Sequence, residues 1–189
     1  MTVRPILPIG HPILRTRTTP VPRSDISSSR IQGLIDDLID TMRHANGAGI
    51  AANQIGDTAR ILTIEVNNNP RYPYKPPVPL TVAINPVLEP LDAETVVINE
   101  GCLSVPLRGE LVRSVNVAVR YTDRQGVDHE RVVRGLTAGT WQHECDHLDG
   151  VLVADRIDPK TLSTWEQFRA HHQDAFVERI TRFVREVGS

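Results

Sequence analysis

Apolar residues in the first quarter of the chain recur with the period of an α-helix. Over residues 31–42 they stand three and four positions apart, which is the spacing of one buried helical face. The serines at 27–29 precede this run as candidate N-caps, and residues 44–47 supply the stop. The pattern predicts an N-terminal helix packed on the core.

The middle of the chain has the shorter apolar and alternating stretches of β-strands. Strands are predicted over residues 61–66, 80–84, 96–98, 115–121 and 127–133. The last two are joined by a turn at 123–126 and form an antiparallel hairpin. Residues 67–80 contain five prolines and are predicted to be an inserted surface loop, while residues 1–20, with four prolines, are predicted to lie extended on the surface.

Two further helical patterns follow the strands. Residues 137–148 form the first, ended by Asp149 and Gly150. Residues 162–187 form a longer C-terminal pattern, interrupted near His171 and carrying arginines beside its apolar stripe. The order of elements predicts an α+β fold in one domain over residues 1–189, with antiparallel sheets packed around the helix at 137–148 and a helix near each end.

Composition excludes several classes of protein. The net charge of 189 residues is -2, so the chain has no basic excess for coating DNA or an anionic membrane. No apolar run approaches the roughly 20 residues that span a bilayer. Two cysteines, Cys102 and Cys145, are too few for a disulfide scaffold, and we expect reduced thiols in a cytoplasmic protein that contacts neither DNA nor membrane.

The central predicted helix carries an HExxH motif, His143-Glu144-Cys145-Asp146-His147. Four residues span slightly more than one helical turn, so both imidazoles project from one face and can bind one metal ion. A metal lowers the pKa of water, and the carboxylate of Glu144 can accept the proton that the attacking water loses. The motif predicts metal-assisted hydrolysis and leaves the third metal ligand open.

Two sources of a third ligand separate two functions. Cys102 lies upstream of the helix, and a thiolate with two imidazoles leaves one coordination position free for water. A zinc endopeptidase of the HExxH type would instead use a ligand downstream of the helix, where Glu166, His171 and His172 are the candidates. Replacing Cys102 would therefore abolish activity in the first case and leave it largely intact in the second.

Three ordered motifs identify a known family. The segments GAGIAANQ (47–54), EGCLS (100–104) and QHECDH (142–147) resemble the signature motifs of peptide deformylases, and IGHPILR (9–15) is similar to the start of that family. The resemblance extends from the N-terminus to about Asp155. It implies removal of the N-formyl group from the initiator formyl-methionine of nascent polypeptides, with release of formate. An inactive binder of formyl-methionyl N-termini is the alternative from another class of protein.

The resemblance also implies a role for each motif residue. Cys102, His143 and His147 would bind one divalent ion, which in this family is characteristically iron (Fe²⁺), with zinc (Zn²⁺) or nickel (Ni²⁺) as substitutes; these ligands suit several such ions. Glu144 would be the general base, and the Gln54 side chain and the Leu103 backbone N–H would hold the developing oxyanion.

Further substrate contacts and one partner follow from the same resemblance. The expected contacts come from the backbones of Gly49 and Gly101 along the substrate, Ile50 at the methionine pocket and Glu100, which orients its surroundings. The expected partners are formyl-methionyl nascent peptides and, through the basic edge of the C-terminal helix, a transient contact with the ribosome.

Overall fold

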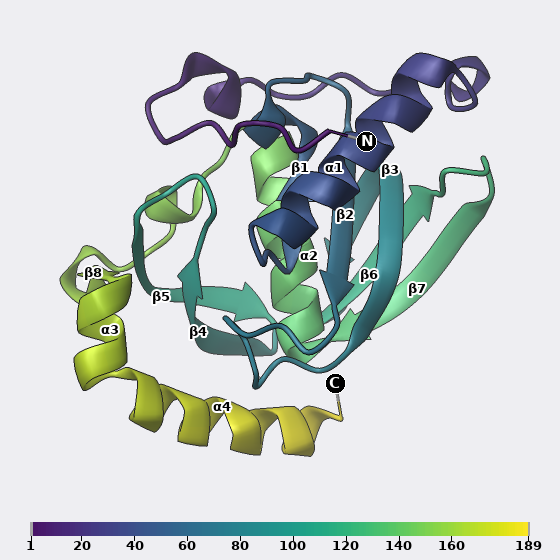
Figure 1. Cartoon of the computed structure of the whole chain (residues 1–189). Helices are drawn as coiled ribbons and strands as arrows, with labels where there is room; N and C mark the ends of the chain where they lie inside the picture. The colour runs from purple at the N-terminus through teal and green to yellow at the C-terminus, as the bar shows by residue number, and fades with distance from the viewer. Residues whose placement is uncertain (1, 189) are drawn as a thin grey trace.

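Two antiparallel sheets enclose a central helix in the computed structural model, which describes residues 2–188. The terminal residues 1 and 189 of the predicted domain lie outside the described part. One sheet has the order β1 (Gly49–Ala51), β2 (Ile61–Val66), β3 (Val78–Pro90), β6 (Asn116–Thr122) and β7 (Asp128–Arg134). The other has the order β4 (Thr95–Gly101), β5 (Leu107–Ser114) and β8 (Ser163–Thr164). Helix α2 (Gly135–Leu148) passes between them (Figure 1).

Helix α1 (Ser29–His44) confirms the predicted N-terminal helix. The side chain of Ser28 accepts a hydrogen bond from the Ile31 N–H at 3.3 Å and satisfies one of the free donors of the first turn. The apolar face of α1 packs on β1 and β2, and Ile35 and Leu38 are fully buried in the cluster of apolar side chains that it shares with them. Burial of this face fixes the position of the loop between α1 and β1.

The strands agree with the predictions where the apolar pattern is clear. Elsewhere the structure has a longer strand than predicted and strands that were not predicted. β2 has the predicted bounds, and β6 and β7 form the predicted hairpin. β3 is longer than predicted because Asn85, at φ 53°, shifts the register and lets the strand continue along β6. β1 and β5 were not predicted: β1 has only three residues, and β5 buries Arg108 and Arg113 where an apolar pattern would be expected.

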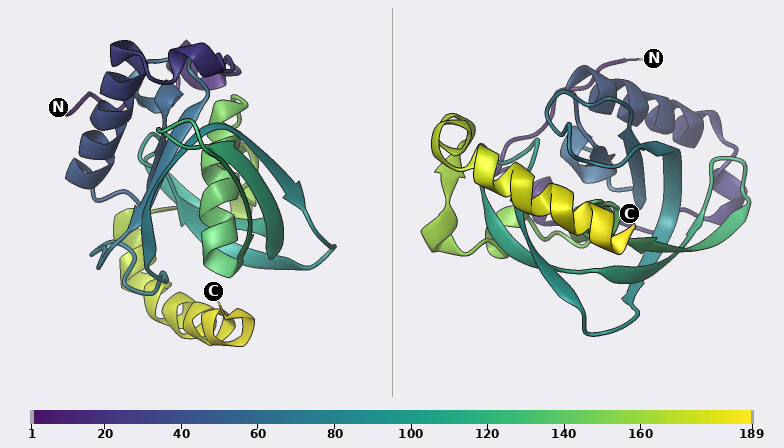
Figure 2. Two further views of the ribbon diagram at one scale, coloured as in Figure 1. Left: turned by 90° about the vertical axis from the view of Figure 1, so that its right-hand side faces the viewer. Right: turned by 90° about the horizontal axis from the view of Figure 1, so that it is seen from below.

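The C-terminal segment is two helices, α3 (Trp165–His171) and α4 (Gln173–Val187). The predicted interruption near His171 is confirmed by the non-helical backbone of His172. The predicted start at residue 162 is wrong, because Ser163 and Thr164 pair with β5 before the side chain of Thr164 caps α3. α4 lies across one end of α2, burying Phe176 and Ile180 in a cluster with Leu136 (Figure 2).

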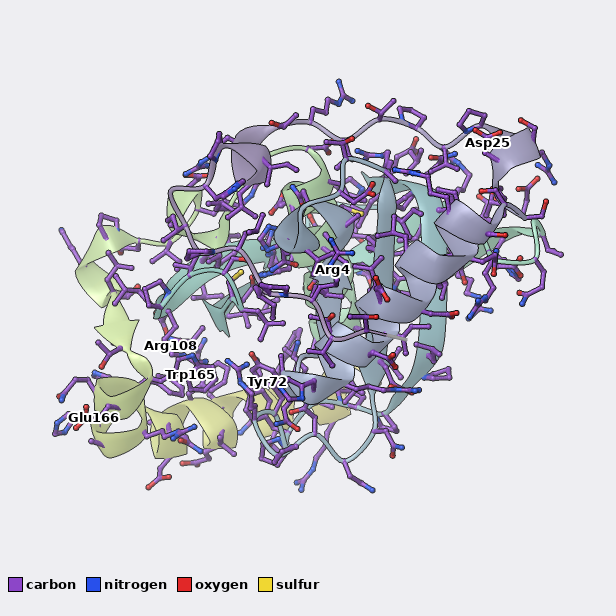
Figure 3. The ribbon with its side chains drawn as sticks, turned by 45° about the horizontal axis from the view of Figure 1, so that its top comes forward. Arg4, Asp25, Tyr72, Arg108, Trp165 and Glu166 are labelled. Carbon is purple, nitrogen blue, oxygen red and sulfur yellow. The ribbon has the colours of Figure 1, made fainter. Side chains whose placement is uncertain are left out.

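The proline-rich segment 67–77 has no helix or strand, as predicted, but it is more than a surface loop. Its Tyr72 is only 8% exposed and packs edge-on against Tyr74 and at a tilt against Trp165 of α3. Figure 3 shows Tyr72, Trp165 and Arg108 gathered on one side of the molecule. The loop therefore lies at the surface as predicted, except that Asn69 and Tyr72 are buried; contact with Tyr74 and Trp165 removes the ring of Tyr72 from water.

The N-terminal segment largely follows its prediction. Most of residues 2–20 are exposed, but a short 3-10 helix, Pro12–Arg15, buries Leu14 completely. Within residues 2–188, no helix combines the length and apolarity needed to cross a membrane.

Candidate metal centre and its cavity

Cys102, His143 and His147 come together in the structure. Their potential ligand atoms all lie within 4.8 Å of one another, and the Cys102 Sγ is 3.2 Å from the His147 Nε2. Cys102 directly follows β4, whereas the two histidines lie one turn apart on α2. Glu166, His171 and His172 are exposed and do not belong to this group. The structure brings the upstream thiol to the HExxH helix, and not the downstream candidates.

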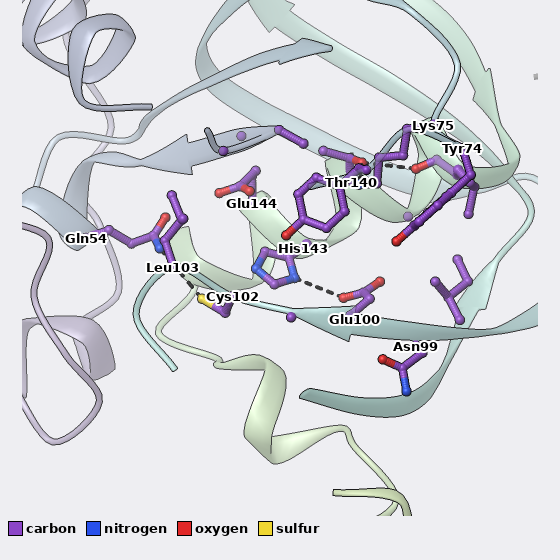
Figure 4. A pocket seen from close by; sticks show the side chains of 18 residues that line it. Gln54, Tyr74, Lys75, Asn99, Glu100, Cys102, Leu103, Thr140, His143 and Glu144 are labelled. Carbon is purple, nitrogen blue, oxygen red and sulfur yellow. Dashed lines mark hydrogen bonds and ion pairs between the residues drawn. The ribbon is translucent and has the colours of Figure 1, made fainter. Parts of the chain in front are cut away.

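Glu100 and Arg113 fix the orientation of His143. The Nδ1 of His143 is 2.9 Å from a Glu100 carboxylate oxygen, which leaves its Nε2 free to face the cluster (Figure 4). Arg113 donates to both oxygens of Glu100 at 2.9 Å and to Asp146 of α2 at 2.6 Å. Because Arg113 is 3% exposed, this network joins β4, β5 and α2 in the interior. Such outer partners hold a metal-binding imidazole in one tautomer and one orientation.

Glu144 lies beside the cluster with an unsatisfied carboxylate. It is 4% exposed, and its Oε2 has no hydrogen-bond partner among the described residues. A Cβ at position 49 would lie 2.6 Å from the other oxygen, so glycine is required there for the carboxylate to approach β1. An orphaned carboxylate beside a thiol and two imidazoles fits a site built for a metal ion and a reactive water.

Gln54 is held in one orientation at the edge of the cluster. Its Oε1 accepts a hydrogen bond from the Ala51 N–H at 2.9 Å, and its Nε2 donates to the Ser104 hydroxyl at 3.1 Å. The same Nε2 is 3.7 Å from the Cys102 Sγ. The side chain is 1% exposed, so its amide N–H groups lie in a dry environment next to the reactive residues.

A cavity extends from the cluster along α2. Its wall includes several of the residues expected to bind or act on the substrate. These are Gln54, Leu103, Glu144, Gly49 of β1, and Glu100 and Gly101 of β4. The structure does not bring the side chain of Ile50 to this wall, because it is fully buried in the core shared with α1. Beyond the cluster the wall is completed by Ile98, Leu136, Gly139 and Thr140 and by three residues of the proline-rich loop, Tyr72, Tyr74 and Lys75.

The three loop residues of this wall were not predicted from the sequence to belong to the site. Residues 67–77 have no apolar period, so nothing in the pattern told buried side chains from exposed ones. The two tyrosines among prolines were the available signal, because a large ring seldom stays in water when a partner surface exists.

The electrostatics of the cluster favour a thiolate. Burial alone would raise the pKa of Cys102, but the charges and hydrogen bonds of His147 and His143 outweigh it and hold that pKa well below its usual value. Burial raises the pKa of Glu144, against the opposing effect of the two imidazoles. A deprotonated cysteine is the form that binds metal ions.

Comparison with known proteins agrees with the motifs. The family model of polypeptide deformylases matches residues 3–163. The chain belongs to this family. It is 42% identical to a peptide deformylase of Leptospira biflexa over 164 residues, which are 86% of this chain and 92% of the relative. It is 43% identical to peptide deformylase 2 of a Nostoc species, over 86% and 90% of the two chains.

Solved structures of the family share the fold. A class I type b peptide deformylase from Acinetobacter baumannii matches with a TM-score of 0.81 and 37% identity, covering 84% of this chain and all of that one. The peptide deformylase from Thermotoga maritima matches with a TM-score of 0.74 and 36% identity, over 84% and 100% of the chains. The mixed fold with antiparallel sheets is therefore that of the family.

Family membership confirms the enzyme class. Peptide deformylases are metal-dependent amide hydrolases that deformylate nascent chains, and this chain holds a metal-capable Cys/His/His group. The alternatives of an endopeptidase and of an inactive binder find no support in these relatives. Because the family match ends at residue 163, α3 and α4 lie beyond it.

Proposed function

We propose that this chain, as one catalytic domain, removes the N-formyl group from formyl-methionyl N-termini of nascent polypeptides and releases formate. One observation carries the proposal: a buried carboxylate without a partner, that of Glu144, lies beside the group formed by Cys102, His143 and His147. This arrangement supplies a proton acceptor and a metal site at the same point.

Cys102, His143 and His147 are the proposed metal ligands, and Fe²⁺ is the proposed native ion, with Zn²⁺ or Ni²⁺ as substitutes. When bound, such an ion lowers the pKa of water and stabilises negative charge on oxygen. Glu100 and Arg113 keep the His143 ring in the orientation that ligation needs, since Glu100 occupies its Nδ1. The neighbouring Asp146 is held by the same Arg113, which restrains the helix that carries both histidines.

Glu144 is the proposed general base and then general acid. Its free Oε2 accepts a proton from the water that attacks the formyl carbon, and the same oxygen then delivers a proton to the amine that leaves. Its close packing on Gly49 fixes the carboxylate before the substrate arrives. A preformed base of this kind avoids the reorganisation that a mobile side chain would require.

Gln54 and the Leu103 backbone N–H are the proposed donors to the developing oxyanion. The formyl oxygen gains negative charge as its carbon becomes tetrahedral, and donors that are fixed in a dry site stabilise that charge most. The bond from the Ala51 N–H to Gln54 prevents its amide from rotating. The Nε2 has two N–H donors, so one can keep its bond to Ser104 while the other donates to the substrate oxygen.

The peptide is proposed to lie along β1. Among residues 2–188 this edge strand pairs with β2 alone, so the backbone groups of Gly49 face away from β2 and are available to an extended chain, with Gly101 on the other side of the cavity. The methionine side chain then enters the cavity between Glu144 and Leu136. Ile50 supports this arrangement indirectly, because its backbone pairs with Thr63 of β2 and its side chain is in the core.

A cytoplasmic location and a transient contact of α4 with the ribosome complete the proposal. Arginines at positions 179, 182 and 185 lie on α4, and Arg182 is mostly exposed to solvent. Arg179 and Arg182 form ion pairs with Glu110 and Glu178, and arginines can exchange such partners for the phosphate groups of ribosomal RNA.

Formate release is the direct test. The protein is prepared without oxygen, loaded with iron and checked for one ion per chain, and then given a formyl-methionyl tripeptide. We expect formate and a free amine in equal amounts, and no cleavage of internal peptide bonds. Metal-loaded, folded protein that releases no formate would overturn the proposal, and cleavage within the peptide would indicate an endopeptidase.

A further inference from the structure

The far end of the cavity is polar, although most of its wall is apolar. Lys75 of the proline-rich loop donates a hydrogen bond from its Nζ to the Thr140 hydroxyl at 2.8 Å (Figure 4). The Thr140 hydroxyl in turn donates to the Leu136 carbonyl at 3.0 Å, one turn earlier on α2. A cation carried by the loop is therefore attached to the same helix that holds Glu144.

Among residues 2–188, the ammonium of Lys75 has no ion-pair partner. Of the cavity carboxylates, Glu100 binds Arg113 and His143, and Glu144 forms no ion pair in the described part of the chain. The ring of Tyr72, whose centroid is 5.0 Å from the Nζ, is the other group that contacts the charge. One hydroxyl acceptor thus serves a group with three N–H donors.

Lys75 is only partly buried. This partial burial lowers the pKa of Lys75, against the opposing effect of the charges on Glu100 and Glu144. The remaining N–H donors of Lys75 line the cavity, where an acceptor atom of a ligand would offset the cost of desolvating the charge. The wall next to Lys75 has no side chain at position 139, which is a glycine; a Cβ there would lie 3.0 Å from the Ile98 side chain.

We propose that Lys75 determines specificity for the side chain of the first substrate residue, donating a hydrogen bond to an acceptor atom near the end of that side chain. The inference rests on the proposed function. It favours a thioether, and still more a sulfoxide, over a hydrocarbon of the same length. A pocket that hydrogen-bonds a substrate atom disfavours an isostere that leaves the donor unpaired.

The test compares three formyl tripeptides that differ only in the first residue: methionine, norleucine and methionine sulfoxide. We expect wild-type kcat/KM for methionine to exceed that for norleucine by about tenfold, because a charged donor contributes more than a neutral one even to a weak sulfur acceptor. Lys75→Met should bring this ratio to about 1 and should lower the sulfoxide rate by about a hundredfold. Lys75→Arg, which keeps a cation, should recover part of the preference.

The matched control is Lys160→Met. Lys160 is the other lysine of the chain and lies exposed in the short helix Pro159–Thr161, so the same substitution there should leave all three rates unchanged. Calorimetry with the deformylated product peptides supplies a second readout. The methionyl product should bind wild-type protein more tightly than the norleucyl product, and the two should bind Lys75→Met equally.

The outcomes separate this inference from the proposed function. A wild-type ratio near 1, or an unchanged ratio in folded Lys75→Met, overturns the role of Lys75 while deformylation stands. Failure of the metal-loaded wild type to release formate from any of the three peptides overturns both. If Lys75→Met does not fold, the role of Lys75 is still tested by the methionine-to-norleucine ratio of the wild type and by that of Lys75→Arg.

Discussion

The cavity has two walls that are held in place in different ways. The catalytic wall comprises β1, the end of β4 and α2, and its reactive groups are fixed by hydrogen bonds and ion pairs such as that between Arg113 and Glu100. The loop wall comprises residues 67–77 and the segments that support them, and it combines edge-on and tilted aromatic contacts with hydrogen bonds from Asn69 and Arg71 to the end of α1 and the loop after it. The first wall depends on the direction of its hydrogen bonds and ion pairs, and the second depends on the contact area between its side chains.

Arg108 is the centre of the loop wall's support. It is fully buried, and its guanidinium carbon lies 4.0 Å from the ring centroid of Trp165 and 3.7 Å from that of Phe168. It also donates to the side chain and the carbonyl of Asn99. Trp165 then packs against Tyr72, so α3, which lies beyond the family match, supports the loop.

The difference predicts how substitutions in the two walls will behave. Hydrogen bonds are directional, and the loss of one in the catalytic wall misplaces a reacting group. Edge-on and tilted ring contacts tolerate small shifts, so substitutions in the loop wall should weaken substrate binding before they slow the chemical step.

The largest effect should come from Cys102→Ser. A serine hydroxyl is a poor ligand at neutral pH, so we expect loss of bound metal and of nearly all formate release. Metal analysis of the purified variant, together with the assay, measures both. Cys145→Ser is the matched control: this thiol is packed in the core, and burial raises its pKa to about 12, so metal content should be unchanged. Retained metal and activity in Cys102→Ser would remove the thiol from the ligand set.

The next largest loss of activity should come from Glu144→Gln. The amide keeps the shape of the side chain and cannot accept the proton, so kcat should fall by about 10²–10⁴-fold. The metal content should stay at one ion per chain, because Glu144 is not among the three grouped ligands. A near-normal kcat at pH 7 with metal bound contradicts the role as general base.

Gln54→Ala should lower kcat by about 10²–10³-fold, the usual loss for one oxyanion donor. KM should change much less, because the contact strengthens as the formyl carbon becomes tetrahedral. Steady-state kinetics with the formyl-methionyl tripeptide separate the two constants. A change confined to KM reassigns Gln54 to binding of the substrate ground state.

The catalytic wall could be predicted from sequence and the loop wall could not, for a physical reason. Residues such as His143 and His147 are placed by the helical period, and Cys102 by a motif that lies next to a strand. Lys75 and Trp165 are 90 positions apart and have no common period, and they reach the same region only through tertiary packing. Ile50 was predicted to line the cavity and does not. Gly49 lines it, but the side chain of Ile50 points to the other face of the strand and into the core.

The fold shows the same division. α1 and β2 follow from apolar periodicity, which reports one buried face. β5 was missed because it buries Arg108 on one face and Arg113 on the other, charged residues whose burial depends on partners elsewhere in the chain. Periodicity reports the hydrophobic effect, and it does not detect burial that is stabilised by ion pairs and stacking.

The smallest effect should come from the loop wall, in Trp165→Ala. Removal of the ring takes away the contacts with Tyr72, Arg71 and Arg108, so the loop should lose its support and KM should rise about tenfold. kcat should change by less than about threefold, because no group of the catalytic wall loses a hydrogen bond.

Trp165→Phe, which keeps an aromatic ring over Arg108, should retain most of the wild-type KM. The chain has only two tryptophans, so in a Trp141→Phe background the fluorescence of Trp165 reports directly on loop packing when product peptide is added. A fall in kcat equal to that of Gln54→Ala, with KM unchanged, would mean that both walls serve the chemical step and that the distinction between them fails.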